Sequence, residues 1–377
     1  MKIIETGILN KGEPGARRAL CTFPCIIPLS DGTLLATYRV GTTKDSEDET
    51  VELRRSTDRG RSWSRPTVPF SSMVEGRKGS LKVAYISQIT EDRLMAAALW
   101  VDRETYPGKP LFNEDTEGCL PMAILVADSD DSGQTWSSWR VVPVPDDVGP
   151  PSLTNPILRF PNGKLAISIE TNKHYEDRSK WYQRVVYVYS SDQGKTWGVP
   201  VTVSQDPTAR IFNWDQRAGV SSDGRLVTFT WWYDRKTTSY LNIRRRISSD
   251  EGKTWSQPED LGITDQPSHP AILPDGRVVL AWVDRYETGS IRARLSEQLD
   301  APFLPETEVV LYSFHRSGQD SSGEAEDTGE MLAEQGRWTF GLPYAEVLSD
   351  GDVMVLYYAG SIDCTSIYWA RLSVDSR

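Results

Sequence analysis

An eight-residue stretch near the N-terminus reads Ser56-Thr57-Asp58-Arg59-Gly60-Arg61-Ser62-Trp63. The pattern Ser-x-Asp-x-Gly-x-(Thr/Ser)-Trp returns at 129–136, 190–197 and 248–255, with its Asp residues separated by 73, 61 and 58 positions. Asp accepts hydrogen bonds from backbone N–H groups of a turn, Gly takes positive φ, and Trp packs over the sheet. The stretch therefore predicts a hairpin turn whose Asp has a structural role.

A second repeat consists of an apolar stretch, a turn and another apolar stretch. Its six turns are centred on Asp31, Asp92, Asn162, Asp223, Asp275 and Asp350. Short strands around Asp-Gly or Asn-Gly indicate β-hairpins, and a period near 60 residues is typical of propeller blades. We expect an all-β protein, a six-bladed β-propeller of four-stranded antiparallel blades, with residues 1–377 forming one domain. The segment 3–9 should supply the outer strand that closes the last blade.

Composition excludes several classes of protein. The net charge is −11 and the pI about 5.0, which argues against a general nucleic-acid binder. The sequence has no apolar run of about 18 residues, so no membrane-spanning helix is expected. The first residues lack a signal-peptide core, so we expect a cytoplasmic protein, or a secreted or periplasmic one whose signal peptide was removed. Four Cys and three His suggest neither a disulfide scaffold nor a metal site, and no cofactor is expected.

The two kinds of turn should lie on the same face of the propeller. They are short and stereotyped, whereas the loops between the second and third strands of each blade are variable and rich in polar side chains. Function concentrates on variable loops held by a rigid scaffold. The active face is therefore predicted opposite the Asp turns.

Arginine recurs where the second strands of the blades end. Arg103, Arg235 and Arg285 each follow a Trp-x-Asp sequence, and Arg39 follows Tyr38 in the first blade. A ring of Arg side chains suits an anionic ligand, because guanidinium groups form bidentate bonds to carboxylates. Alternatively, each Arg pairs with its neighbouring Asp and caps its strand.

Carboxylates are expected on the same face. The first blade contributes the acidic loop 45–49, the third contributes Glu170, and Asp215 stands at the start of the fourth. A carboxyl with a raised pKa can protonate a glycosidic oxygen, and aromatic side chains suit sugar rings. The acidic loop alternatively serves only as a solvated surface.

These repeats cover nearly the whole chain and resemble the Asp-box, or BNR, repeats of the sialidase superfamily. The resemblance implies a glycoside hydrolase that acts on a terminal, anionic sugar of a glycan. The stretch from Thr37 to Asp58 is similar to the loop that carries the family's acid/base Asp, which corresponds to Asp45. Asp215 falls where the family has the Glu that serves its Tyr nucleophile.

Other positions depart from the family pattern. Thr22-Phe23-Pro24 stands in place of the Arg-Ile-Pro motif, and Leu342 occupies the nucleophile's place, with Tyr344 two residues later. The resemblance implies catalysis by Asp45, Tyr344 and Asp215. The arginines at the strand ends, with a carboxylate and a Tyr of the same face, are the expected substrate-binding residues: Arg39, Arg103, Arg235, Arg285, Glu170 and Tyr358. If Tyr344 faces the core, Asp215 would instead activate water, giving inversion.

Two other functions remain open on this scaffold. One is a glycosidase for a non-sialic sugar or a lyase of acidic polysaccharide, and the other is a non-catalytic glycan-binding propeller. The segment 313–337, with its Ser, Gly and acidic residues, predicts a mobile flap over the active face or a solvated insertion.

Overall fold

The computed structural model describes residues 1–314 and 327–375. Its largest sheet has seven strands in the order β23-β24-β25-β2-β3-β4, with β1 paired antiparallel to β25. A single parallel bridge, from Leu20 to Thr365, joins β2 to β25. The strands of this sheet are β1 (Lys2–Asn10), β2 (Leu20–Pro28), β3 (Leu34–Gly41), β4 (Thr50–Ser56), β23 (Phe340–Val347), β24 (Val353–Gly360) and β25 (Thr365–Ser373). The expected closure by the N-terminal strand is confirmed.

Four further sheets complete the strands of the described residues. The first two contain β5 (Met73–Val74), β6 (Arg77–Gln88), β7 (Leu94–Asp102), β8 (Met122–Ser129) and β9 (Arg140–Val141), then β10 (Ser152–Leu153), β11 (Leu158–Arg159), β12 (Leu165–Glu170), β13 (Arg184–Ser190) and β14 (Val201–Gln205). The other two contain β15 (Ile211–Val220), β16 (Leu226–Asp234), β17 (Ser239–Ser248) and β18 (Glu259–Asp260), then β19 (Ala271–Ile272), β20 (Val278–Asp284), β21 (Ser290–Ser296) and β22 (Val309–Ser313).

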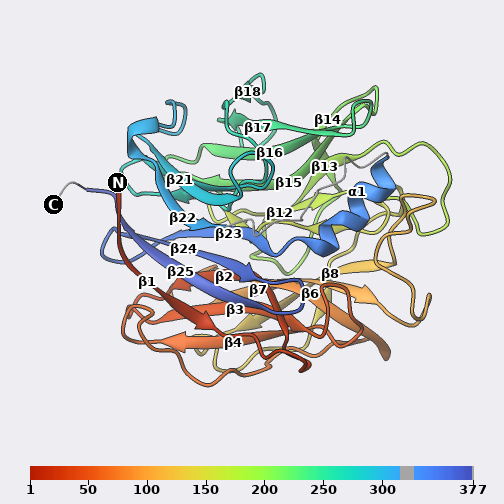
Figure 1. Cartoon of the computed structure of the whole chain (residues 1–377), viewed down its shortest axis with the longest axis horizontal. Helices are drawn as coiled ribbons and strands as arrows, with labels where there is room; N and C mark the ends of the chain where they lie inside the picture. The colour runs from red at the N-terminus through yellow and green to blue at the C-terminus, as the bar shows by residue number, and fades with distance from the viewer. Residues whose placement is uncertain (315–326, 376–377) are drawn as a thin grey trace.

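The fold is an all-β propeller, as the hairpin repeats predict. The count of six separate four-stranded blades is not confirmed: in residues 1–314 and 327–375 the strands form five sheets, two of which have four strands. Figure 1 shows the C-terminal strands, in blue, between the red N-terminal strands and the cyan strands β21 and β22. The middle strands β3, β7 and β20 are buried along their whole length, because neighbouring sheets cover both of their faces.

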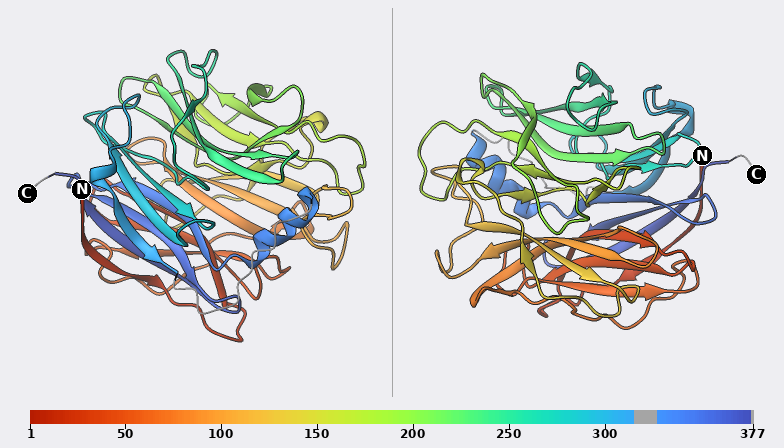
Figure 2. Two further views of the ribbon diagram at one scale, coloured as in Figure 1. Left: turned by 45° about the horizontal axis from the view of Figure 1, so that its top comes forward. Right: turned by 180° about the vertical axis from the view of Figure 1, so that it is seen from behind.

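Within residues 1–314 and 327–375, helical structure is confined to short segments. They are η1 (Asp146–Val148), η2 (Pro305–Thr307), α1 (Thr328–Glu334) and η3 (Gln335–Arg337). Asp327 caps α1 by accepting a hydrogen bond from the Glu330 amide at 2.9 Å. Both views of Figure 2 show α1 on the side of the molecule away from the two chain ends.

The Asp turns have the structural role that the sequence predicts. In the third copy, Asp192 accepts hydrogen bonds from the amides of Lys195 and Thr196 at 3.1 and 2.9 Å and from the Thr196 hydroxyl at 2.6 Å. The Ser190 hydroxyl accepts from the Gly194 amide at 2.8 Å. Gly194 has a φ of 80°, which a side chain would strain. In the other copies the Asp carboxylate likewise accepts from the Ser or Thr hydroxyl, and the first Ser hydroxyl accepts from the Gly amide.

Candidate functional site

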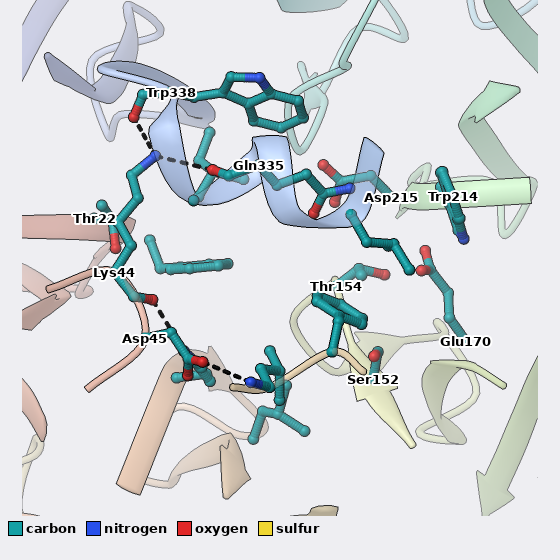
Figure 3. A pocket seen from close by; sticks show the side chains of 18 of the residues that line it. Thr22, Lys44, Asp45, Ser152, Thr154, Glu170, Trp214, Asp215, Gln335 and Trp338 are labelled. Carbon is teal, nitrogen blue, oxygen red and sulfur yellow. Dashed lines mark hydrogen bonds and ion pairs between the residues drawn. The ribbon is translucent and has the colours of Figure 1, made fainter. Parts of the chain in front are cut away.

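A cavity of about 410 Å³ lies among the sheets, a size that suits a small-molecule ligand. Arg39 of β3, Glu170 of β12, Asp215 of β15 and Tyr358 of β24 line it, together with Leu332 of α1. Figure 3 shows Asp45 on one side of this cavity and Glu170 on the other. None of the four turn aspartates lines it, in agreement with their predicted place on another face.

Bulges in β2, β6, β15 and β23 place several of the lining residues. The pairing register shifts between Thr22 and Cys25, between Leu81 and Val83, between Trp214 and Arg217, and between Gly341 and Tyr344. A bulge re-aims the side chain of its extra residue. The residues inside the bulges that line the cavity are Phe23, Lys82, Asp215 and Leu342. Phe23, Asp215 and Leu342 have φ values of 51°, 47° and 47°.

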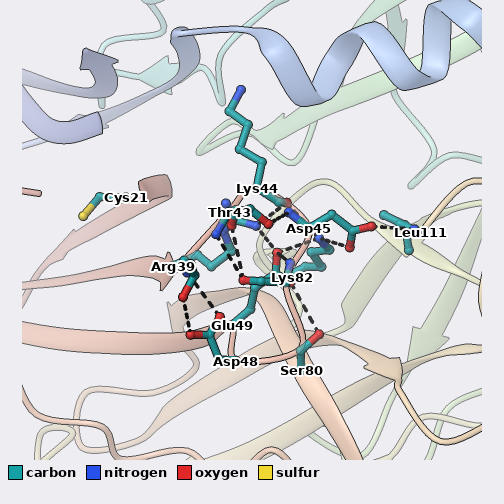
Figure 4. Close-up of polar contacts among 12 residues, drawn as sticks. Cys21, Arg39, Thr43, Lys44, Asp45, Asp48, Glu49, Ser80, Lys82 and Leu111 are labelled. Atoms are coloured by element: carbon teal, nitrogen blue, oxygen red, sulfur yellow. Dashed lines mark hydrogen bonds and ion pairs between the residues drawn. The ribbon is translucent and has the colours of Figure 1, made fainter. Parts of the chain in front are cut away.

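Asp45 belongs to a cluster of buried charges on one wall of the cavity (Figure 4). Its Oδ1 accepts from Lys82 Nζ at 3.0 Å and from Arg103 Nη2 at 2.7 Å, while its Oδ2 accepts from the Leu111 amide at 2.6 Å. Burial opposes ionisation, but Lys82 and Arg103 outweigh it and hold the pKa of Asp45 well below its usual range. Asp45 is therefore a carboxylate at neutral pH.

Glu49 lies behind Asp45 and joins the same cluster. Its fully buried carboxylate accepts from Arg39, from Lys82 at 2.8 Å and from Arg103 at 3.4 Å. Three cations thus face two carboxylates, which leaves one positive charge uncompensated within the cluster. The Nε and Nη2 atoms of Arg39 are buried and have no hydrogen-bond partner in the described residues. Arg39 also lines the cavity, so it offers donors that suit an anion.

Lys44 crosses the same wall toward the segment that follows α1. Its Nζ donates to the backbone oxygens of Trp338 and Gln335, and bonds to the Tyr358 hydroxyl at 2.9 Å. Burial, followed by the nearby cations Arg285 and Arg39, lowers the pKa of Lys44 well below its ordinary value. The cavity therefore contains an amine and a phenol in direct contact.

The opposite wall carries two neighbouring carboxyl groups, Glu170 and Asp215. The Gln216 amide donates to Glu170 Oε1 at 2.9 Å. Asp215 Oδ1 pairs with Arg217 Nη2 at 2.7 Å, and its Oδ2 accepts from Gln266. Burial and then the charge of Asp215 raise the pKa of Glu170 to about 8. This wall thus holds one carboxyl that retains its proton at neutral pH.

Indole rings supply part of the apolar surface of the cavity. Trp181, Trp214, Trp231 and Trp338 all line it. Trp214 stacks on Tyr233 with ring centres 4.8 Å apart, and Trp338 lies over the Arg285 guanidinium at 3.8 Å. Rings fixed in this way present apolar faces against which a sugar ring can pack.

The predicted catalytic residues divide into two groups. Asp45 and Asp215 line the cavity, and their catalytic roles remain predictions. Tyr344 does not: it is 2% exposed and belongs to the hydrophobic core, where its ring stacks on His269 with centres 4.8 Å apart. Its expected position at the reacting centre is therefore wrong, because the bulge at Leu342 turns that residue toward the cavity instead.

The predicted binding residues divide similarly. Arg39, Glu170 and Tyr358 line the cavity, whereas Arg103, Arg235 and Arg285 do not. These three arginines instead hold surrounding elements together. Arg103 binds Asp45, Arg235 pairs with Glu117 at 2.5 Å, and Arg285 pairs with Asp265 at 3.1 Å. Of the predicted ring of arginines, Arg39 alone lines the cavity in the described residues, and an anion-binding role for these side chains remains a prediction.

The alternative, an ion pair between each Arg and the preceding Asp, does not hold for these three either. Asp102 and Asp284 accept hydrogen bonds from backbone N–H groups and a Thr hydroxyl of the turns that follow them. Asp234 binds Arg210, whose Nε donates to the two carboxylate oxygens at 2.9 and 3.0 Å. The acidic residues thus fix the strand ends, while the arginines reach across to other segments.

Several residues that line the cavity were not predicted from the sequence. Lys44 lies next to Asp45, Lys82 lies in a bulge, and Gln266 precedes a short strand. One sequence signal was available: Phe23, Thr154, Asp215 and Leu342 all line the cavity and stand eight positions before a turn residue of the second repeat. Lys82 and Gln266 break that spacing.

The structure describes only part of the segment that was predicted to form a flap. Residues 315–326 of the segment 313–337 lie outside the described residues. In the remainder, Met331 and Leu332 are buried, and Leu332, Ala333, Gln335 and Gly336 line the cavity. The helical part is thus a packed wall of the site rather than a solvated insertion.

Metal and membrane sites receive no support from the described residues. There, no group of three or more His, Cys, Asp or Glu side chains is placed to hold a metal ion. No helix in the same part of the chain is long and apolar enough to cross a bilayer. Cys21, Cys25, Cys119 and Cys364 are free thiols.

Comparison with known proteins places the chain among sialidase-like propellers. A curated sialidase of Bacteroides fragilis is 23% identical over 290 residues, which cover 68% of this chain and 48% of the relative. The chain thus spans about half the length of that relative.

Two solved structures match almost the whole fold. A Dyadobacter fermentans protein of unknown function has a TM-score of 0.75 and 19% identity, and covers 99% of both chains. The intramolecular trans-sialidase of Ruminococcus gnavus has a TM-score of 0.66 and 14% identity, and covers 97% of this chain and 96% of that one. These likenesses confirm the sialidase-like propeller. The model of the BNR repeat-containing family matches residues 6–259, and the chain belongs to that family.

Proposed function

We propose that this protein is a glycoside hydrolase that releases a terminal, anionic sugar from a glycan. The observation that carries the proposal is the charge asymmetry of the cavity. Its first wall has an excess cation and the unpartnered donors of Arg39, and its second wall has the carboxyl groups of Glu170 and Asp215. A sugar carboxylate fits the first wall, which leaves the glycosidic bond near carboxyl groups.

The state of Asp45 suggests which half of the reaction it serves. Lys82 and Arg103 favour its carboxylate form, so we assign it the activation of water rather than the donation of a proton. Because Tyr344 lies in the core, the proposal includes no covalent intermediate on tyrosine. Direct attack by water predicts inversion at the anomeric carbon.

For the scaffold we propose a ring of six blades. The six hairpin turns support this count. So does the pairing of β2 with β25, which the described residues limit to one position, from Leu20 to Thr365. With that sheet divided there, β23, β24, β25 and β1 form one blade and β2, β3 and β4 belong to another. Each blade then contributes its bulged or irregular first strand to the cavity.

Hydrolysis of chromogenic glycosides tests the activity. The panel should include sialosides, uronides and neutral sugars, with the product anomer identified by NMR. We expect cleavage of an anionic member, and Asp45→Asn should reduce turnover about a hundredfold or more. Glu47→Gln is the matched control, because Glu47 lies in the same loop but makes exposed contacts, with Lys78 and the Gly108 amide. Preference for a neutral sugar would contradict the proposed substrate class.

A specific contact favours a second function, a lyase of acidic polysaccharide. Lys44 has a lowered pKa and touches Tyr358 within the cavity, and such a pair can remove the proton next to a uronate carboxylate. β-Elimination leaves an unsaturated sugar that absorbs ultraviolet light, whereas hydrolysis does not. Incubation with uronate polysaccharides therefore separates the two functions. Binding of an anionic glycan without turnover would instead indicate a binding module.

A further inference from the structure

Glu170 is set apart from the other acidic residues of the cavity by its lack of a cationic partner. It ends β12, is 7% exposed and lines the cavity. Its Oε1 accepts a hydrogen bond from the Gln216 amide at 2.9 Å. In the described residues it forms no ion pair with a basic side chain, whereas Asp45 and Asp215 are both paired. The fold therefore fixes this carboxyl in place without neutralising it.

Asp215 lies beside Glu170 and takes the available cation. Its carboxylate is held between Arg217 and Gln266, at a bulge residue with a φ of 47° (Figure 3). The charged groups that face Glu170 are Asp215 and, more weakly, Arg217. Two adjacent buried carboxyls resist double ionisation, so the unpaired one keeps its proton. Burial raises the pKa of Glu170 first, and the charge of Asp215 adds to it.

We propose that Glu170 is the catalytic proton donor of this cavity and that Asp215 is the positioning residue that keeps it protonated. The inference rests on the proposed hydrolase function. It identifies a general acid for the reaction, a role that Asp45 cannot fill because it is ionised. In the reaction, the Glu170 proton passes to the glycosidic oxygen as the bond to the anomeric carbon breaks and its electron pair goes to that oxygen. Water, deprotonated by Asp45, forms the new bond.

The cycle closes by proton exchange with solvent. After product release, Asp45 loses the proton it took from water, and the Glu170 carboxylate regains one. The step consumes one water molecule and needs no oxidant or reductant. Figure 3 places Asp45 and Glu170 on opposite sides of the cavity, as attack and departure on opposite faces of a sugar require.

Leaving-group dependence tests the role of Glu170 directly. Glycosides of one sugar with leaving groups of increasing acidity should be compared in the wild type and in Glu170→Gln. A variant without its acid should lose about a hundredfold or more with a poorly acidic leaving group, and little with one that departs unprotonated. Equal losses across the series, or none, would overturn the proposal while leaving hydrolysis intact. A wild type that cleaves no glycoside would overturn the proposed function as well.

Two readouts separate an acid from a merely structural carboxyl. The alkaline limb of kcat/KM should vanish in Glu170→Gln, and Asp215→Asn should move that limb to lower pH, because removal of the neighbouring charge lowers the pKa of Glu170. Infrared spectra of the free protein should show a protonated carboxyl that Glu170→Gln removes.

Glu346→Gln is the matched control, since burial raises the pKa of Glu346 to about 7 but this residue does not line the cavity. It should remove a different infrared band and leave the alkaline limb in place. An unmoved alkaline limb in Asp215→Asn would contradict the role given to that residue.

Discussion

Neutralising Glu49 should destabilise the protein more than any surface charge of the same loop. The Glu49 carboxylate is fully buried and contacts Arg39, Lys82 and Arg103. Glu49→Gln keeps the shape of the side chain but leaves three buried cations with Asp45 as their only carboxylate. Removing one partner of a buried ion pair costs about 3–5 kcal/mol. We therefore expect the free energy of unfolding to fall by about that amount.

Urea-induced unfolding of the wild type and the variant measures this change. Glu47→Gln is the control, because Glu47 and Lys78 are about half exposed and such pairs contribute about 0–1 kcal/mol. Moderate salt should leave the Glu49 effect nearly unchanged, since buried pairs are little screened. A loss below about 1 kcal/mol in Glu49→Gln would refute the idea that water is excluded from this cluster of charges.

Three further outcomes are expected. Because the pKa of Glu170 is raised, its protonated carboxyl contributes stability that is fully present below about pH 4.5 and lost as pH rises through about 8. The free energy of unfolding of Glu170→Gln should therefore lack this fall with pH. Identical pH profiles for the wild type and the variant would contradict the shift. Asp192→Ala should lower the midpoint of thermal unfolding without changing turnover, since it removes only bonds within its turn; impaired catalysis in the folded variant would argue otherwise. Burial raises the pKa of Cys25 to about 12, so alkylation followed by mass spectrometry should label the half-buried Cys364 before Cys25, and prior labelling of Cys25 would show that its strand opens.

Features repeated in the sequence were the ones that could be predicted. The Asp turns and hairpins follow from local residue patterns, and the repeat register placed Asp215 in the cavity. The ion-pair partners of Arg235 and Arg285 could not be predicted, because Glu117 and Asp265 lie in loops that no repeat aligns. Tyr344 was misplaced because a bulge between Gly341 and Tyr344 shifts the register of the strand, so that Leu342, which the repeat spacing marks, lines the cavity instead.

The pairing of β1 with β25 has a consequence for biosynthesis. Residues 2–10 are translated long before their partner strand, which spans residues 365–373. During most of translation the first strand therefore lacks its native strand partner, and the ring stays open until β25 emerges. Such late, long-range pairing slows folding and leaves strand edges available to other chains. Nascent chains stalled before β25 should consequently depend on chaperones that shield exposed strands, and that dependence should end abruptly once the final strand is released.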